Sequence, residues 1–110
     1  MAQQLNKHEL EVASKEFKSW ELNENELRKT FTFKSFRDAI TFITRISFDA
    51  DEMDHHPEIS NLYNKVSIRL TTHDAGNKVT EKDIRLAERI QENADLFLDS
   101  KTSEKTPSYS

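Results

Sequence analysis

The chain has 110 residues, of which 35% are hydrophobic and 33% are charged, and its formal net charge is −4. This length predicts one domain with a small core under a well-solvated surface. No basic cluster indicates nucleic-acid binding, and the absence of cysteine excludes disulfides, thiol nucleophiles and thiolate metal sites. No apolar run is long enough to span a membrane, and the first residues lack the features of a signal peptide, so we expect a cytoplasmic protein.

The first third of the chain predicts a helix followed by a β-hairpin. The helix is expected over residues 6–20, where Asn6 and Glu9 resemble a capping box. Apolar and polar side chains then alternate in residues 20–22 and 29–34, which is typical of two strands of a hairpin.

A second helix is predicted to begin at Ser35 and to end just before Pro57, because the residue before a proline disfavours the helical conformation. One face of this helix carries apolar residues at helical spacing. The members of this stripe are Phe36, Ile40, Ile43, Ala50 and Met53, widened by Ala39 and Ile46.

The clearest strand signal covers residues 63–73, where alternation directs Val66, Ile68 and Leu70 to one face. It is read as one long strand or two short ones. A last helix follows a turn and is capped by Thr80 and Asp83; its stripe is Ile84, Ala87, Ile90, Ala94 and Phe97 or Leu98.

These elements predict an α+β fold in the order α-β-β-α-β-β-α, in which a small antiparallel sheet of about four strands is covered on one face by three helices. The predicted domain covers residues 1–99, and residues 100–110 are expected to be a disordered tail rich in Ser and Thr. A sheet this small has exposed edges, and residues 63–70 contain no blocking proline, so we expect pairing with a second subunit.

The most informative feature is a pair of adjacent histidines, His55 and His56, followed by Pro57. Imidazole titrates near neutral pH and can act as either acid or base. A third histidine, His73, lies on the polar face or at the end of the predicted strand. Eliminating water from a carbon that bears both hydroxyl and nitrogen requires an acid for the hydroxyl and a base for the N–H, which such a set could supply. Asp51, four residues before His55, would lie on the same helical face and support it.

Purely structural roles for these residues are alternatives to the acid–base interpretation. His8 is expected to be an ordinary surface residue, and Asp83 could serve only as the third residue of a capping box. Asp51 could be a solvated carboxylate at a helix end, and Tyr63 could fill a sheet edge. A metal site is a further alternative, because nitrogen and oxygen ligands are offered by Asp51, His55, His56 and His73. Adjacent imidazoles diverge, however, and the usual helical pair of histidines four residues apart is absent.

The spacing resembles the signature of the pterin-4a-carbinolamine dehydratases. That signature is an acid, three residues, His-His-Pro, five or six residues, an aromatic residue, nine residues, His and then Asp. The positions that carry it here are Asp51, His55-His56-Pro57, Tyr63, His73 and Asp83. The resemblance covers about residues 5–97, and its motif has several parts with fixed gaps.

The resemblance implies dehydration of 4a-hydroxytetrahydrobiopterin to the quinonoid dihydropterin, a step in regenerating the cofactor of aromatic amino acid hydroxylases. It implies no metal and no bound cofactor, and a homodimer or homotetramer. Animal members of the family also act as dimerisation cofactors of a homeodomain transcription factor. A non-catalytic interaction module is therefore a second hypothesis, and it would add a nuclear location.

The resemblance assigns the pterin site to His55, His56 and His73 as catalytic residues. The residues expected to bind or support the substrate are Asp51, Pro57, Glu58, Ile59, Tyr63 and Asp83. Two positions depart from the family. Ile59 stands where an aromatic residue is frequent, and Asp51 is shorter than the glutamate common in animal members.

Overall fold

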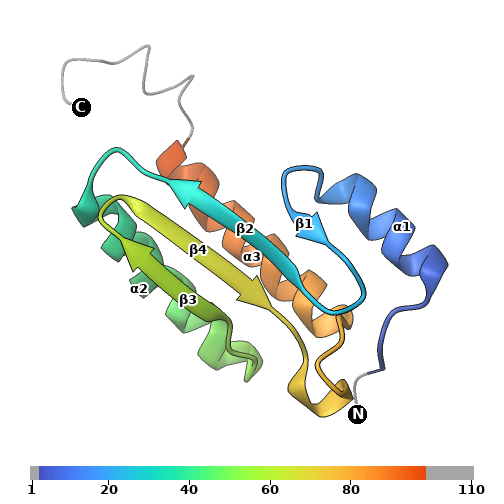
Figure 1. The fold of residues 1–110 in the computed structure, drawn as a ribbon. Coiled ribbons are helices and arrows are strands. Elements are labelled where there is room, and N and C mark those ends of the chain that lie inside the picture. Colours follow the sequence, from blue (N-terminus) through green and yellow to red (C-terminus); the bar gives the residue numbers. More distant parts are fainter. Residues whose placement is uncertain (1–2, 99–110) are drawn as a thin grey trace.

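A computed structural model describes residues 3–98, which form three α-helices, one short 3-10 helix and four strands (Figure 1). The predicted tail, residues 100–110, lies outside the described residues. The elements in chain order are α1 (Lys7–Glu16), β1 (Glu21–Leu22), β2 (Leu27–Thr32), α2 (Phe36–Met53), β3 (Glu58–Leu62), β4 (Lys65–Leu70), η1 (His73–Ala75) and α3 (Glu81–Leu98).

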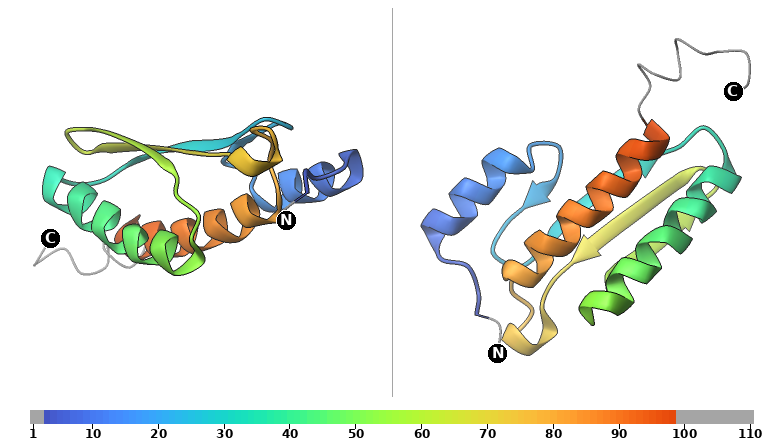
Figure 2. Two further views of the ribbon diagram at one scale, coloured as in Figure 1. Left: turned by 90° about the horizontal axis from the view of Figure 1, so that it is seen from below. Right: turned by 180° about the vertical axis from the view of Figure 1, so that it is seen from behind.

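The four strands form one antiparallel sheet in the order β1-β2-β4-β3. The strands make one layer and the helices lie on one side of it, so the opposite face of the sheet is open (Figure 2). The predicted α+β class and the order of its elements are thereby confirmed. Because β4 lies between β2 and β3, the segment in which we expected a free edge is internal, and the edge on that side of the sheet is β3.

Local sequence explains where α1 begins and ends. The Asn6 side chain accepts a 2.8 Å hydrogen bond from the Glu9 N–H, and the Glu9 carboxylate accepts one of the same length from the Asn6 N–H. The helix ends at Glu16 and not at Trp20 as predicted, because Phe17 leaves the helical conformation. Trp20 is then free to pack on the core, where its ring lies 5.8 Å from that of Phe31.

The strand predicted over residues 63–73 is observed as the shorter strand β4, which covers Lys65–Leu70. A tight turn and a separate strand, β3, precede it. Tyr63 adopts a left-handed conformation with φ of 53° and turns the chain between β3 and β4. The Asn61 side-chain amide donates to the carbonyls of Tyr63 (3.1 Å) and Lys65 (2.9 Å), which stabilises this turn. Beyond Leu70 the chain leaves the sheet and enters η1.

The core lies between the sheet and helices α2 and α3. Aromatic rings meet there: Phe42 of α2 is 5.2 Å from Phe31 of β2 and 4.8 Å from Phe33, which follows β2. The stripe predicted for α2 is partly wrong, because Phe36 and Ile40 are exposed while Phe42 is fully buried. The buried positions of α2 are Ala39, Phe42, Ile46 and Ala50, which follow the helical period; all except Phe42 belong to the predicted stripe. None of the helices in residues 3–98 is long and apolar enough to cross a membrane.

Replacing Leu86 by Ala should lower the free energy of unfolding by about 2–5 kcal/mol, because this fully buried side chain of α3 would leave a cavity. Leu96 lies on the same helix but is 68% exposed, so Leu96→Ala should change stability by less than about 1 kcal/mol. Urea unfolding followed by circular dichroism measures both values. Equal losses for the two variants would contradict the described core.

Candidate active site

The end of α2 determines where the two adjacent histidines lie. Helix α2 ends at Met53, and Asp54 caps it in a left-handed conformation with φ of 50°. The cap is held by the His55 N–H, which donates to the Ala50 carbonyl at 3.0 Å. Because the helix does not continue to residue 56, side chains in the cap do not follow the helical spacing assumed from the sequence.

His55 points inward and pairs with a carboxylate from another helix. Its Nε2 lies 2.6 Å from Oδ1 of Asp83 in the first turn of α3. His55 is 9% exposed and Asp83 is completely buried. A carboxylate accepts hydrogen bonds, so Nε2 carries the proton that bonds to Asp83. The other ring nitrogen, Nδ1, is then left to give or take a proton.

The second oxygen of Asp83 is held by two threonines. Oδ2 accepts from the Thr72 hydroxyl at 2.8 Å and from the Thr80 N–H at 2.9 Å. The sequence had indicated Thr80 only as a helix cap, and it gave no signal for Thr72 beyond its place before His73. Asp83 therefore caps α3, as predicted, and also contacts His55. This single carboxylate joins the end of α2, the segment after β4 and the start of α3.

His56 forms a separate pair at the surface. Its Nε2 lies 2.9 Å from Oδ1 of Asp51, with side-chain exposures of 59% and 79%. The predicted partnership between Asp51 and His55 is wrong, since the left-handed cap at Asp54 places His56 beside Asp51 and turns His55 into the interior. Each of the two adjacent imidazoles thus hydrogen-bonds to a carboxylate of its own.

His73 begins η1 directly after Thr72 and is exposed. Its Nδ1 lies 3.2 Å from the side-chain oxygen of Asn77, so Nδ1 donates and Nε2 is the nitrogen without a proton when the ring is neutral. The strand was predicted to run to residue 73, but β4 ends at Leu70, so His73 lies beyond the strand and in η1. Thr72, the residue before His73, hydrogen-bonds to Asp83, so the segment that carries His73 is attached to the same carboxylate that binds His55.

The remaining predicted residues are divided between the two ends of β3. Pro57 leads from the histidine pair into β3, where Ile59 packs against the core and Glu58 bonds to Arg69 at 3.1 Å. Tyr63 lies just past the far end of β3 and is seven residues after His56, which corresponds to about 23 Å of extended chain. Within one chain, the structure does not bring Tyr63 to the histidines.

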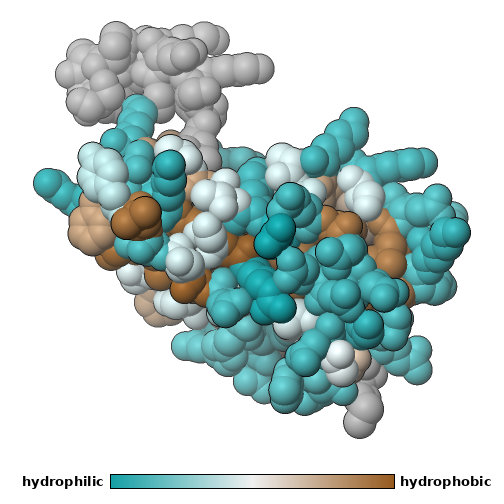
Figure 3. Space-filling model, viewed as in Figure 1, coloured by the Kyte–Doolittle hydropathy of each residue, from teal (hydrophilic) through white to brown (hydrophobic). Residues whose placement is uncertain are grey.

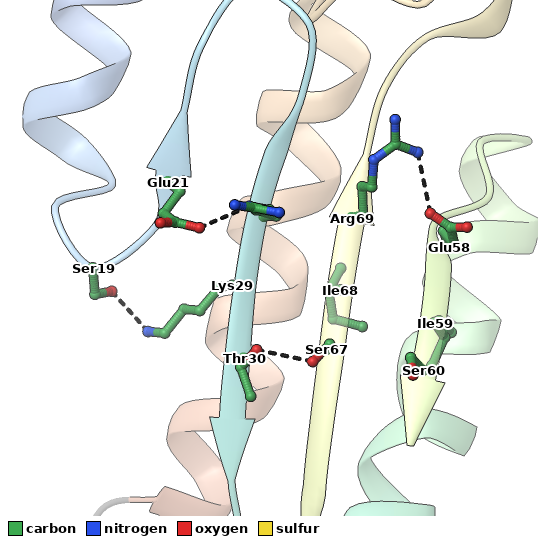
Figure 4. A pocket seen from close by; sticks show the side chains of 11 residues that line it. Ser19, Glu21, Lys29, Thr30, Glu58, Ile59, Ser60, Ser67, Ile68 and Arg69 are labelled. Carbon is green, nitrogen blue, oxygen red and sulfur yellow. Dashed lines mark hydrogen bonds and ion pairs between the residues drawn. The ribbon is translucent and has the colours of Figure 1, made fainter. Parts of the chain in front are cut away.

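A hollow of about 640 Å³ lies on the open face of the sheet, and none of the three predicted catalytic histidines lines it. Side chains from all four strands line it, among them Glu58 and Ile59 of the predicted site (Figure 4). Two of its cations have shifted pKa values. The hydrogen bonds that the Arg69 guanidinium donates to Glu26 and Glu58 raise the pKa of Arg69, whereas burial lowers the pKa of the Lys29 ammonium. The space-filling view shows a mostly hydrophilic surface over these strands, with hydrophobic residues visible between the polar ones (Figure 3).

The metal alternative depended on four side chains meeting at one ion. Among residues 3–98, no three His, Asp or Glu side chains gather in a geometry that could hold a metal ion. The proposed ligand set of Asp51 with the three histidines is therefore not assembled in this part of the chain.

Comparison with solved structures defines the class of protein. A structure from Brucella melitensis, described as a transcriptional coactivator/pterin dehydratase, has a TM-score of 0.77 and 33% identity, and covers 83% of this chain and 98% of its own. A pterin dehydratase-like protein described as a RuBisCO assembly factor in the alpha-carboxysome has a TM-score of 0.56 and 24% identity, over 68% of this chain and 86% of its own. The second likeness concerns the fold alone. The fold is that of the pterin dehydratases.

Sequence comparison gives the family. The family model for pterin 4 alpha carbinolamine dehydratase matches residues 3–93. A relative from Opitutus terrae, provisionally named for this activity, is 49% identical over 69% of this chain and 78% of its own. Another relative, from Sulfurisphaera tokodaii and with the same provisional name, is 41% identical over 80% of this chain and 94% of its own. The chain belongs to the pterin-4a-carbinolamine dehydratase family of enzymes, as its motif predicted.

The two carboxylates should differ strongly in their contribution to stability. Asp83→Asn leaves one buried donor without an acceptor and should lower the free energy of unfolding by about 3 kcal/mol. Asp51→Asn removes an exposed contact and should cost less than about 1 kcal/mol. Chemical denaturation at neutral pH measures both. A loss for Asp51→Asn as large as that for Asp83→Asn would contradict the described burial.

Proposed function

We propose that this chain dehydrates 4a-hydroxytetrahydrobiopterin, the pterin-4a-carbinolamine, to the quinonoid dihydropterin in tetrahydrobiopterin regeneration, with His55, His56 and His73 as the acid–base groups. The observation that carries the proposal is the pairing of two adjacent imidazoles with separate carboxylates, Asp83 and Asp51, in a chain of this family. The names of the relatives support the reaction, and the geometry supports the choice of residues.

The reaction breaks the bond between the carbinolamine carbon and its hydroxyl oxygen. One proton is added to the departing hydroxyl, which leaves as water, and one proton is removed from the neighbouring nitrogen as the carbon–nitrogen double bond forms. The reaction therefore needs an acid and a base within reach of one substrate. Because only protons are transferred, the proposed step requires no redox cofactor.

The hydrogen bonds of each histidine indicate which ring nitrogen would exchange a proton with the substrate. Asp83 accepts a hydrogen bond from Nε2 of His55, and Asp51 accepts one from Nε2 of His56. In both rings Nδ1 is therefore the nitrogen that remains for proton exchange with the substrate. Each carboxylate would also stabilise the imidazolium that forms when its ring takes up a proton. His73 bonds through Nδ1, which leaves its Nε2 for the substrate.

The three histidines should differ from His8 in an activity assay. Replacing His55, His56 or His73 by Ala should reduce the dehydration rate, with a loss of about 10²- to 10⁴-fold for a residue that acts as the acid or the base. The assay follows the loss of 4a-hydroxypterin absorbance against the spontaneous reaction. His8→Ala, on the exposed surface of α1, should retain wild-type activity. Wild-type rates for all three site variants would refute the assignment.

We further propose that the chain forms a homodimer or homotetramer. Large apolar side chains are exposed on the surface, which is typical of association sites. On α2 they are Phe36, Ile40 and Phe48, and at the turn between β3 and β4 they are Leu62 and Tyr63. The free edge of β3 offers backbone groups for pairing as well.

Sedimentation equilibrium should therefore give a mass that is two or four times the 12.9 kDa of the chain. Phe48→Glu, which places a charge on a side chain that is 72% exposed, should shift the equilibrium toward smaller species if α2 forms the interface. A single-chain mass for the wild type at micromolar concentration would contradict the proposal.

A further inference from the structure

We propose that Thr72, supported by Thr80, is a positioning residue that fixes the carboxylate of Asp83 and, through it, the ring of His55. The inference deepens the proposed function and rests on it for its catalytic consequence. Its structural part, the orientation of one imidazole, can be measured without any activity.

The hydrogen bonds of the two hydroxyls have a defined direction. Each hydroxyl has one proton to give. Thr72 gives its proton to Oδ2 of Asp83 at 2.8 Å, so across the 2.6 Å contact between the two threonines Thr80 must be the donor. The Thr80 oxygen in turn accepts from the Lys82 N–H at 3.2 Å. All the donors in this chain of hydrogen bonds are therefore directed toward the carboxylate.

In this arrangement the two oxygens of Asp83 bind different partners. Oδ2 is occupied by the Thr72 hydroxyl and the Thr80 N–H, and Oδ1 remains for His55 at 2.6 Å. The terminal torsion of an aspartate side chain has broad, weakly defined minima, so its carboxylate is oriented by its hydrogen bonds. Rotation of the carboxylate would break the contacts with both threonines. The fixed Oδ1 then keeps the proton of His55 on Nε2 and leaves Nδ1 facing away from Asp83.

Burial makes these contacts effective. Thr72 is 2% exposed and Thr80 and Asp83 are fully buried, so water does not compete for the carboxylate. Hydrogen bonds in such an environment are electrostatically stronger than at the surface. Thr72 also directly precedes His73, so the same hydroxyl anchors the chain segment that carries the third histidine.

A threonine at this place could instead serve stability alone. The variant Thr72→Val distinguishes the two roles because it keeps the shape of the side chain and removes only the hydroxyl. Thr72→Ser restores the hydroxyl. Thr71→Val is the matched control, since the Thr71 hydroxyl donates to the Asn25 carbonyl and is not among the groups that hydrogen-bond to Asp83.

The experiment combines ¹⁵N NMR of the histidine rings at alkaline pH, where the rings are neutral, with steady-state dehydration kinetics. In the wild type and in Thr71→Val, His55 should show one protonated and one unprotonated nitrogen. In Thr72→Val the two ¹⁵N shifts of His55 should move toward each other as the second tautomer becomes populated. The kcat should fall by about tenfold, with KM changed less than about twofold, and Thr72→Ser should recover most of both signals.

Unchanged His55 shifts in Thr72→Val would overturn the proposal, whatever happens to the rate. Altered shifts together with no dehydratase activity in the wild type would uphold the positioning of His55 and refute the proposed function instead. If Thr72→Val does not fold, Thr72→Ser and Thr72→Ala give the same comparison. Both lose the methyl group, and only Ser keeps the hydroxyl, so equal spectra for the two would also overturn the proposal.

Discussion

The buried carboxylate of Asp83 is the constraint on which the arrangement of the site depends. Removing a carboxylate from water costs several kcal/mol unless hydrogen bonds replace those of the solvent. Here the replacements come from His55, Thr72 and Thr80, which belong to three separate segments of the chain. Satisfying one charge therefore holds the end of α2, the segment after β4 and the start of α3 together. The geometry around His55 follows from this requirement.

The two adjacent histidines occupy different physical environments as a result. His55 is held by a buried partner in a region of low effective dielectric, where its hydrogen bond is strong and its orientation is fixed. His56 bonds to Asp51 in contact with water, where such a pair contributes little to stability. The first ring is thus held in one orientation, and the second can move with little cost. In the proposed acid–base role, the two neighbouring residues would combine one rigid and one adaptable group.

The open face of the sheet satisfies its own charges. Arg28 and Arg69 face each other on β2 and β4, a pairing of like charges that would be unfavourable alone. Glu26 bridges both guanidinium groups, and Glu21 and Glu58 extend the row to the outer strands. This row crosses all four strands, so the polarity of the face follows from pairing within the chain. The large exposed apolar side chains lie elsewhere, on the helices and at the turn between β3 and β4.

The sequence by itself determined the class of fold, the capping of α3 by Asp83 and the family, because these depend on local periodicity and on fixed spacings between residues. It could not determine which carboxylate meets which imidazole. The spacing of Asp51 and His55 suits a continuous helix, but the left-handed residue Asp54 ends that helix. His55 then meets Asp83, 28 positions further along the chain, and this contact exists only when α2 and α3 pack on the same sheet. Packing likewise decided that Phe42 of α2 is buried while Phe36 and Ile40 are exposed, because several apolar positions could have faced the core and only tertiary contacts selected among them.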